Sequence, residues 1–117
     1  MNQKDKIVIR KILQYCKDID RMINRFGDDI QEYEADMAYQ YACSMCIIQI
    51  GELVGQLSDE LKNERPEVSW KLIKDMRNLF AHDYARVDNE IVWDTLKNNI
   101  PDLREKCKSI LDEDLFE

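Results

Sequence analysis

Residues 4–25 read KDKIVIRKILQYCKDIDRMINR, and this stretch decides the fold class. Apolar side chains recur in it every three or four residues, the period of an α-helix with one apolar stripe. The stripe consists of Ile9, Ile12, Cys16, Ile19 and Ile23. Gly27 comes after the stretch and is well placed as a C-terminal cap. The pattern predicts an amphipathic helix whose apolar face is buried against other helices.

A second helix is predicted to begin between Ile30 and Asp36 and to run to about Asn63, which makes it the longest. Its apolar stripe consists of Cys43, Ile47, Ile50, Val54 and Leu57. Gly51 and Gly55 lie four residues apart on one face, where each costs roughly 1 kcal/mol relative to Ala. Such a pair indicates close packing against a neighbouring helix, and chance is the alternative.

The dipeptide Arg65-Pro66 breaks the helical pattern. Ser69 is a good N-cap for a helix that begins at the next residue. A third helix is therefore predicted from Trp70 to about Phe80.

The C-terminal third predicts two more helices. The segment 82–87 is interpreted as a turn, after which Asp88 or Asn89 caps a fourth helix. Pro101 is expected in the first turn of a fifth helix. The acidic tail 112–117 is expected to fray.

The composition agrees with this helical pattern. The chain has 117 residues, enough for one domain. Three Gly and two Pro are few, which disfavours disordered chains and loop-rich all-β folds. We find no strand pattern and predict a single all-α domain over residues 1–117, an antiparallel bundle of four to five helices.

Charge is unevenly distributed along the chain. There are 24 acidic and 17 basic residues, a net charge of −7. No Lys or Arg occurs between Phe26 and Leu61, whereas residues 62–87 carry six bases and four acids. This excludes a wide basic face for nucleic acid and leaves room for a small positive site in the middle of the chain.

Membrane and secretory signals are not found. No apolar run approaches the ~20 residues of a membrane span, and the N-terminus leads into no signal-peptide core. We predict a cytoplasmic protein with no membrane contact. Its four cysteines are then expected to be thiols. The pair Cys43-x-x-Cys46 is interpreted as two small buried hydrophobes, with metal binding or redox exchange as the less favoured alternative.

The run from Met76 to Tyr84 concentrates the reactive side chains. His82 is the chain's only histidine, which excludes the zinc motifs that need paired His, and we predict no metal and no cofactor. Arg77 and His82 are five residues apart, about 140° around an ideal helix. They meet at one substrate only if the helix ends near His82, and the break expected after Phe80 provides this.

One Arg and one His suit metal-free attack of a ribose 2′-OH on the adjacent phosphate. The histidine moves the proton, and the arginine holds the phosphate and stabilises the developing charge. Because one His cannot easily be both acid and base, a two-fold dimer would supply the second. The alternative interpretation of His82 is a helix cap or a partly buried structural residue.

Other residues are candidates for supporting roles. Lys74 adds positive potential one turn before Arg77, and Asn78 shares a helix face with His82. Glu52 is placed to orient Arg77 across the bundle, although a solvent-facing Glu is the favoured alternative.

Two further groups have alternative interpretations. Core or dimer packing is preferred to base stacking for the aromatic residues Trp70, Trp93, Tyr39 and Tyr41. The acidic segment 28–36 is interpreted as the solvated start of a helix, or as a docking surface for a basic partner.

The run Arg77-Asn78-x-x-x-His82-x-Tyr84 resembles the R-x4-H-x-Y motif of HEPN-domain proteins, specifically the HepT-like toxins of prokaryotic toxin–antitoxin pairs. Its surroundings are similar over nearly the whole chain. The matching segments are Ile50-Gly51-Glu52, Trp70, the stretch 87–93 and Pro101-Asp102-Leu103.

The resemblance implies a helical homodimer in which two motif copies face a shared cleft. It implies a metal-independent endoribonuclease with Arg77 and His82 as the catalytic pair and Asn78 as a polar helper. It further implies a type VII-like partner, a minimal nucleotidyltransferase antitoxin that neutralises the toxin by adding AMP to Tyr84. Two rivals remain: a non-catalytic substrate-binding or regulatory subunit of a nucleotidyltransferase complex, and a dimeric scaffold without activity.

Overall fold

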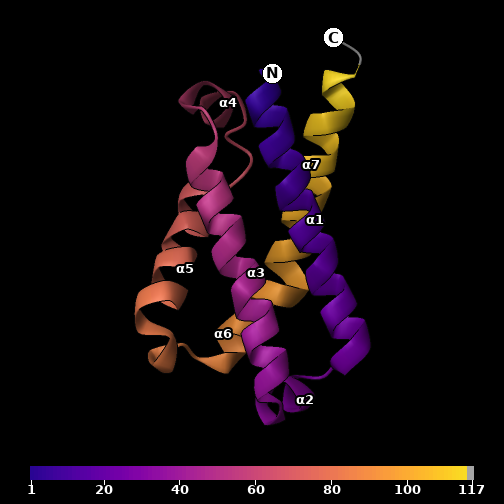
Figure 1. Cartoon of the computed structure of the whole chain (residues 1–117), viewed down its shortest axis with the longest axis vertical. Coiled ribbons are helices and arrows are strands. Elements are labelled where there is room, and N and C mark those ends of the chain that lie inside the picture. The colour runs from indigo at the N-terminus through magenta and orange to yellow at the C-terminus, as the bar shows by residue number, and fades with distance from the viewer. Residues whose placement is uncertain (116–117) are drawn as a thin grey trace.

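The computed structural model describes residues 1–115, and within them every regular element is helical (Figure 1). Four long helices run antiparallel to their chain neighbours: α1 (Gln3–Phe26), α3 (Met37–Gln56), α5 (Trp70–Asp83) and α7 (Ile100–Asp114). The short elements are α2 (Ile30–Ala35), α4 (Asp59–Glu64), the 3₁₀ turn η1 (Tyr84–Arg86), α6 (Asn89–Asp94) and the π-helical turn η2 (Thr95–Asn99). The predicted all-α antiparallel bundle is confirmed.

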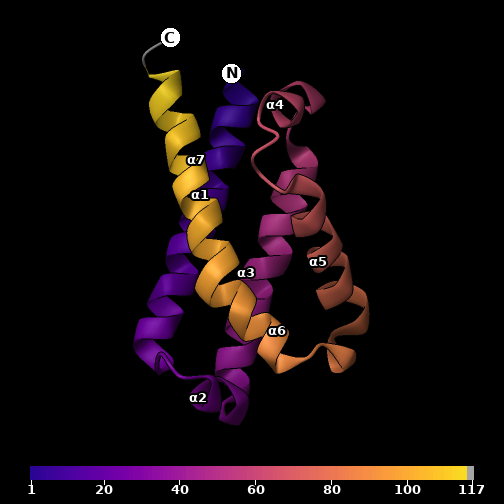
Figure 2. The same cartoon turned by 180° about the vertical axis from the view of Figure 1, so that it is seen from behind.

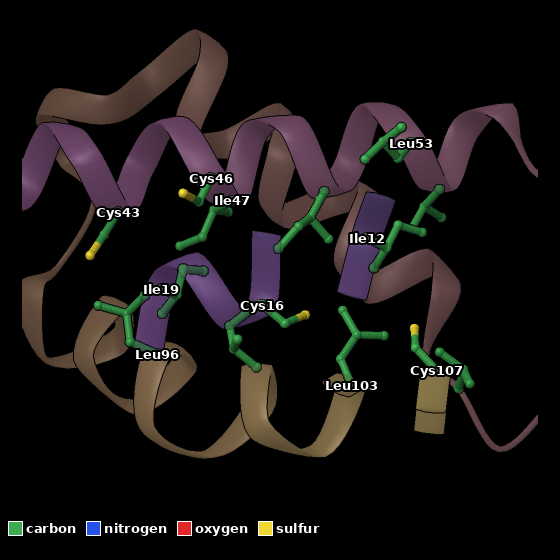
Figure 3. Close-up of a cluster of buried hydrophobic side chains, with 14 of the residues drawn as sticks. Ile12, Cys16, Ile19, Cys43, Cys46, Ile47, Leu53, Leu96, Leu103 and Cys107 are labelled. Atoms are coloured by element: carbon green, nitrogen blue, oxygen red, sulfur yellow. The ribbon is translucent and has the colours of Figure 1, made fainter. Parts of the chain in front are cut away.

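Helix α3 lies in the middle of the bundle. It packs against α1 on one side and α5 on the other, while α7 covers α1 from behind (Figure 2). The core between α1, α3 and α7 is built from the predicted stripes (Figure 3). Ile12, Cys16 and Ile19 of α1 face Ile47 of α3 and Leu103 of α7 there.

All four cysteines are buried free thiols, as predicted for the Cys43-x-x-Cys46 pair. Burial raises the pKa of Cys46 to about 11 and those of Cys43 and Cys107 to about 12, and it also raises the pKa of Cys16. These thiols therefore pack as small neutral hydrophobes.

The second helix was predicted to run to about Asn63 and to be the longest, which is wrong: α3 ends at Gln56, and with 20 residues it is shorter than α1 with 24. Asp36 has an extended backbone and accepts hydrogen bonds from the amides of Ala38 and Tyr39, so it caps α3 and separates it from α2. Leu57 is also extended, and the Ser58 hydroxyl caps α4 by accepting from the Leu61 amide at 3.1 Å.

The junction between α3 and α4 is tied to α1 by Asp5, which is buried. The Asp5 carboxylate accepts hydrogen bonds from the Ser58 amide at 2.9 Å and the Ser58 hydroxyl at 2.5 Å. A buried carboxylate needs such partners, so this contact fixes where α3 ends.

The third helix is longer than predicted. It continues past Phe80 to Asp83 and is followed directly by η1, so the turn expected from residue 82 begins later. Ser69 occupies the N-cap position, but its side chain makes no capping hydrogen bond to the described residues. The start of α5 is held instead by Trp70, whose indole Nε1 donates to the Arg65 carbonyl at 3.0 Å.

The predicted fourth and fifth helices form one continuous helical run. Asp88 caps α6, as expected, by accepting from the Glu90 amide at 2.9 Å. The run then passes through η2 into α7, with Pro101 in the first turn of α7. Pro101 has no N–H for the carbonyl one turn earlier, and the wider π-helical turn accommodates this missing bond.

Helix α7 extends into the acidic tail that was expected to fray and ends at Asp114. The Asp114 carboxylate pairs with the Lys6 ammonium at 2.7 Å, and this contact lowers the pKa of Asp114. Glu113 forms an ion pair with Arg65. Residues 116–117 lie outside the described part of the chain.

Candidate functional site

The site is organised by a close contact between α3 and α5 at Gly51. A Cβ atom added to Gly51 would lie 2.1 Å from Cβ and 2.6 Å from Cγ of Arg77, far inside contact distance. Gly51 therefore allows the stem of Arg77 to lie directly on the α3 backbone. The close packing predicted from the glycine pair is confirmed at Gly51, whereas no described atom lies within 4 Å of a Cβ added to Gly55.

The guanidinium of Arg77 is held from both sides. Its Nη2 forms an ion pair with Glu52 of α3, and its Nη1 donates to the Asn78 side-chain oxygen at 2.9 Å. Its Nε is buried and has no hydrogen-bond partner among residues 1–115. Each terminal nitrogen carries two hydrogens, so one on each remains for a ligand.

Glu52 combines the two alternatives left open by the sequence. The side chain is 45% exposed, so it does face solvent, and it also pairs with Arg77. Arg77 itself is 28% exposed, which leaves the ends of its guanidinium accessible.

A hollow of about 290 Å³ opens beside this pair, between α3 and α5. Its lining consists of Gly51, Glu52, Gly55, Gln56, Lys74, Arg77 and Asn78. Four of the predicted site residues thus share one cavity: Glu52, Lys74, Arg77 and Asn78. Gln56 and Gly55 were not predicted as site residues, because nothing in their spacing shows that open space lies between them and α5.

His82 lies outside this hollow, exposed in the last turn of α5. The predicted helix break between Arg77 and His82 is absent, so the two remain on one continuous helix. Five residues correspond to about 7.5 Å of rise and about 140° of rotation. Asn78 lies four residues before His82 and is also exposed, so Asn78 and His82 share the solvent-facing side of α5.

Tyr84, two residues after His82, is half-buried in η1. Its ring meets Phe80 edge-on at a centroid distance of 6.0 Å and lies 6.3 Å from the ring of Tyr41 on α3. Because Phe80 is buried in the core, these contacts fix the end of α5 to the bundle.

An apolar stripe on α3 leads toward the end of α5 that carries His82 and was not predicted. Met37, Tyr41 and Met45 are 62%, 59% and 59% exposed and repeat every four residues along one helix face. Tyr41 is thus not a core residue of the single chain, whereas Tyr39, Trp70 and Trp93 are packed as expected. The four-residue spacing of these apolar side chains was the available signal.

The acidic segment 28–36 has local structural roles. Asp29 and Asp36 cap α2 and α3, and Asp28 pairs with Lys97 of η2 at 2.6 Å.

Two kinds of site are not found within residues 1–115. No three His, Cys, Asp or Glu side chains there converge as metal ligands would. None of the helices described is long and apolar enough to span a bilayer.

Comparison with known proteins assigns the family. The family model described as Ribonuclease HepT-like matches residues 12–110. The chain belongs to the HepT-like ribonuclease family. The run Arg77-Asn78-x-x-x-His82-x-Tyr84 lies at the end of α5 and the start of η1, and of these residues Arg77 and Asn78 line the hollow.

Relatives are found in archaea and bacteria. A Methanocaldococcus jannaschii protein named "Putative RNase MJ0125" is 32% identical over 107 residues, which covers 91% of this chain and 90% of the relative. "Putative RNase TTE0752" of Caldanaerobacter subterraneus is 29% identical over 106 residues, 91% and 93% of the two chains. "Probable ribonuclease HepT" of Thermococcus cleftensis is 29% identical over 91 residues, 76% and 83%. No solved structure gives a significant match. The family and the names of these relatives thus support a ribonuclease of the HEPN type.

Proposed function

We propose that this chain is the toxin of a type VII-like toxin–antitoxin pair, a metal-independent endoribonuclease that cleaves through Arg77 and His82. The observation that carries the proposal is the way in which the Arg77 guanidinium is held. Its guanidinium is fixed by Glu52 and Asn78 and keeps one free N–H on each terminal nitrogen, little more than one helical turn from an exposed histidine. A fixed guanidinium with free N–H donors is suited to hold a phosphate.

The reaction that suits these groups needs no metal. One imidazole removes the proton of a ribose 2′-OH, whose oxygen attacks the adjacent phosphorus. Arg77 stabilises the charge that develops on the phosphate oxygens. The bond to the 5′-oxygen breaks as that oxygen receives a proton from an imidazolium, which leaves a 2′,3′-cyclic phosphate and a 5′-OH.

The proposal includes a homodimer, because the reaction needs both a base and an acid while each chain has one His. A two-fold dimer across the stripe of Met37, Tyr41 and Met45 would bring the partner's copy of His82 toward the same cleft. The exposure of this stripe beside the motif supports such an interface. It would also compensate for the rotation of about 140° between Arg77 and His82 of one chain.

The proposed partner is a minimal nucleotidyltransferase antitoxin that adds AMP to Tyr84. Tyr84 lies two residues from His82 and is half-buried rather than enclosed, which leaves part of its surface open. A nucleotide ester there would add bulk and negative charge where the RNA strand passes.

The test is cleavage of a broad RNA pool by the purified chain in EDTA, beside Arg77→Ala and His82→Ala. Circular dichroism checks that each variant folds, and mass spectrometry checks that Tyr84 carries no nucleotide. Cleavage by the unmodified wild type and a loss of at least about 100-fold in both variants are expected. No cleavage by unmodified wild type would contradict the proposal and favour a non-catalytic subunit of a nucleotidyltransferase complex.

A further inference from the structure

The hollow between α3 and α5 extends beyond what the reacting phosphate needs. Arg77 occupies its end at Gly51, and the rest continues along α3 toward Gly55 and Gln56. The hollow's volume of about 290 Å³ is far more than one ordered water requires. It therefore has room for a second group beside the one held by Arg77.

Lys74 supplies a second positive charge on the α5 side of the hollow. It lies one turn before Arg77, is exposed, and makes no ion pair within residues 1–115. Lys71, one turn earlier, is already paired with Asp75 at 3.6 Å. Of these two lysines, Lys74 alone lines the hollow with its charge uncompensated.

The α3 side of the hollow, across from Lys74, has no side chain at Gly55. A Cβ added there would meet no described atom within 4 Å, so the α3 backbone borders open space opposite Lys74. The carboxylate that lines the hollow, Glu52, is already committed to Arg77. The charges of Arg77, Lys74 and Glu52 therefore sum to one net positive charge, which favours an anion.

We infer that the part of the hollow between Lys74 and Gly55 is a subsite for the phosphate next to the one that is cut. The RNA strand then lies along the hollow between α3 and α5. One phosphodiester is held at the Arg77 guanidinium, and its neighbour is held at the Lys74 ammonium. This rests on the proposed ribonuclease function and specifies how the same site holds RNA.

The experiment compares Lys74→Ala and Gly55→Leu with Lys71→Ala as the matched control on the same helix. Cleavage of a short RNA in EDTA gives KM and kcat, and fluorescence anisotropy gives the affinity for the same oligonucleotide in uncleavable 2′-deoxy form. For Lys74→Ala we expect KM and Kd to rise about 5–10-fold with little change in kcat, and the slope of log K against log salt to fall by about 0.7. Gly55→Leu fills the subsite and is expected to raise Kd at least as much, while Lys71→Ala leaves both constants near the wild-type values.

Equal KM and Kd for Lys74→Ala, Lys71→Ala and wild type would overturn the subsite, even if the wild type cleaves RNA normally. A fall in kcat at constant KM would overturn it too, because a binding subsite acts on affinity. Failure of the ribonuclease proposal has a different signature: the wild type itself does not cleave, whatever the binding data give.

Discussion

Two faces of α3 are built in opposite ways. One face is closed by side chains such as Cys43, Ile47 and Ile50, which are 0%, 3% and 1% exposed. A neighbouring face has the glycines Gly51 and Gly55 instead, one covered by the stem of Arg77 and one open to a hollow. The same helix thus closes the core with one face and, at Gly51 and Gly55, makes space for a charged side chain and for a ligand.

Gly51→Ala gives the largest expected effect, because it forces α5 away from α3. The new methyl would overlap Arg77 Cβ, which cannot move without its backbone, and such overpacking costs about 1–3 kcal/mol. The shift of α5 also misplaces the Arg77 guanidinium. We therefore expect the rate of RNA cleavage to fall about 100-fold or more. Urea unfolding and cleavage in EDTA measure the two effects. A variant that cleaves like wild type would show that the α3–α5 contact does not position Arg77.

Glu52→Ala is expected to reduce kcat about 10- to 100-fold without raising KM. It frees the guanidinium to move and also removes a negative charge beside the RNA, so binding should not weaken. Because Glu52 is 45% exposed, the change in unfolding free energy should stay within about 1 kcal/mol.

Glu52→Gln is the conservative control, since it keeps an acceptor for Arg77, and it should recover part of kcat. An increase of KM alone in Glu52→Ala would instead identify Glu52 as part of the ground-state binding surface.

The buried thiols of the core between α1, α3 and α7 predict a pH effect. The pKa of Cys107 is raised to about 12 by burial, against about 8.5 in an unfolded chain. Above pH 8.5 the Cys107 thiol loses its proton in the unfolded state but keeps it in the folded state. The free energy of unfolding therefore falls as the pH rises. Between about pH 8 and 9.5 each such thiol contributes a loss of about 1 kcal/mol.

Cys107→Ala removes one of these thiols, so its unfolding free energy should fall less between the two pH values than that of wild type. Urea unfolding under reducing conditions measures the difference. Parallel pH dependences would show that this thiol is not a buried neutral group.

Gly55→Ala has the smallest expected effect and the opposite sign to Gly51→Ala. The new methyl meets no described atom, and Ala favours the helix over Gly by up to about 1 kcal/mol. A small rise in the urea midpoint is expected, and a clear loss of stability would show that the hollow is closed in solution.

The sequence predicted the helical bundle because its apolar stripes are long and regular, as in residues 4–25. It placed the start of the second helix only between Ile30 and Asp36, and it did not predict the break at Leu57, which depends on tertiary context. Asp36 caps α3 in the middle of a helical pattern, and Ser58 is held by Asp5 from another helix, 53 residues away in the chain. A local pattern contains no information about such a partner.

The site was predicted only in part, because some of its features depend on contacts between helices. Arg77, Asn78 and Lys74 are grouped by helical spacing, which is visible in the sequence itself. The contact of Arg77 with Gly51 depends on how closely α5 approaches α3, so the glycine pair alone left close packing and chance open. The continuation of α5 past Phe80 depends on the packing of Tyr84 on Phe80 and Tyr41, a contact between two helices.

The most direct test of the central claim is the chemistry of the product ends. The wild-type chain cleaves a defined RNA in EDTA, and mass spectrometry identifies the new termini. Attack by the 2′-OH with Arg77 and His82 predicts a 2′,3′-cyclic phosphate and a 5′-OH, and no cleavage where a single 2′-deoxynucleotide replaces the attacking ribose. A 5′-phosphate and 3′-OH, or cleavage at the deoxy position, would contradict it.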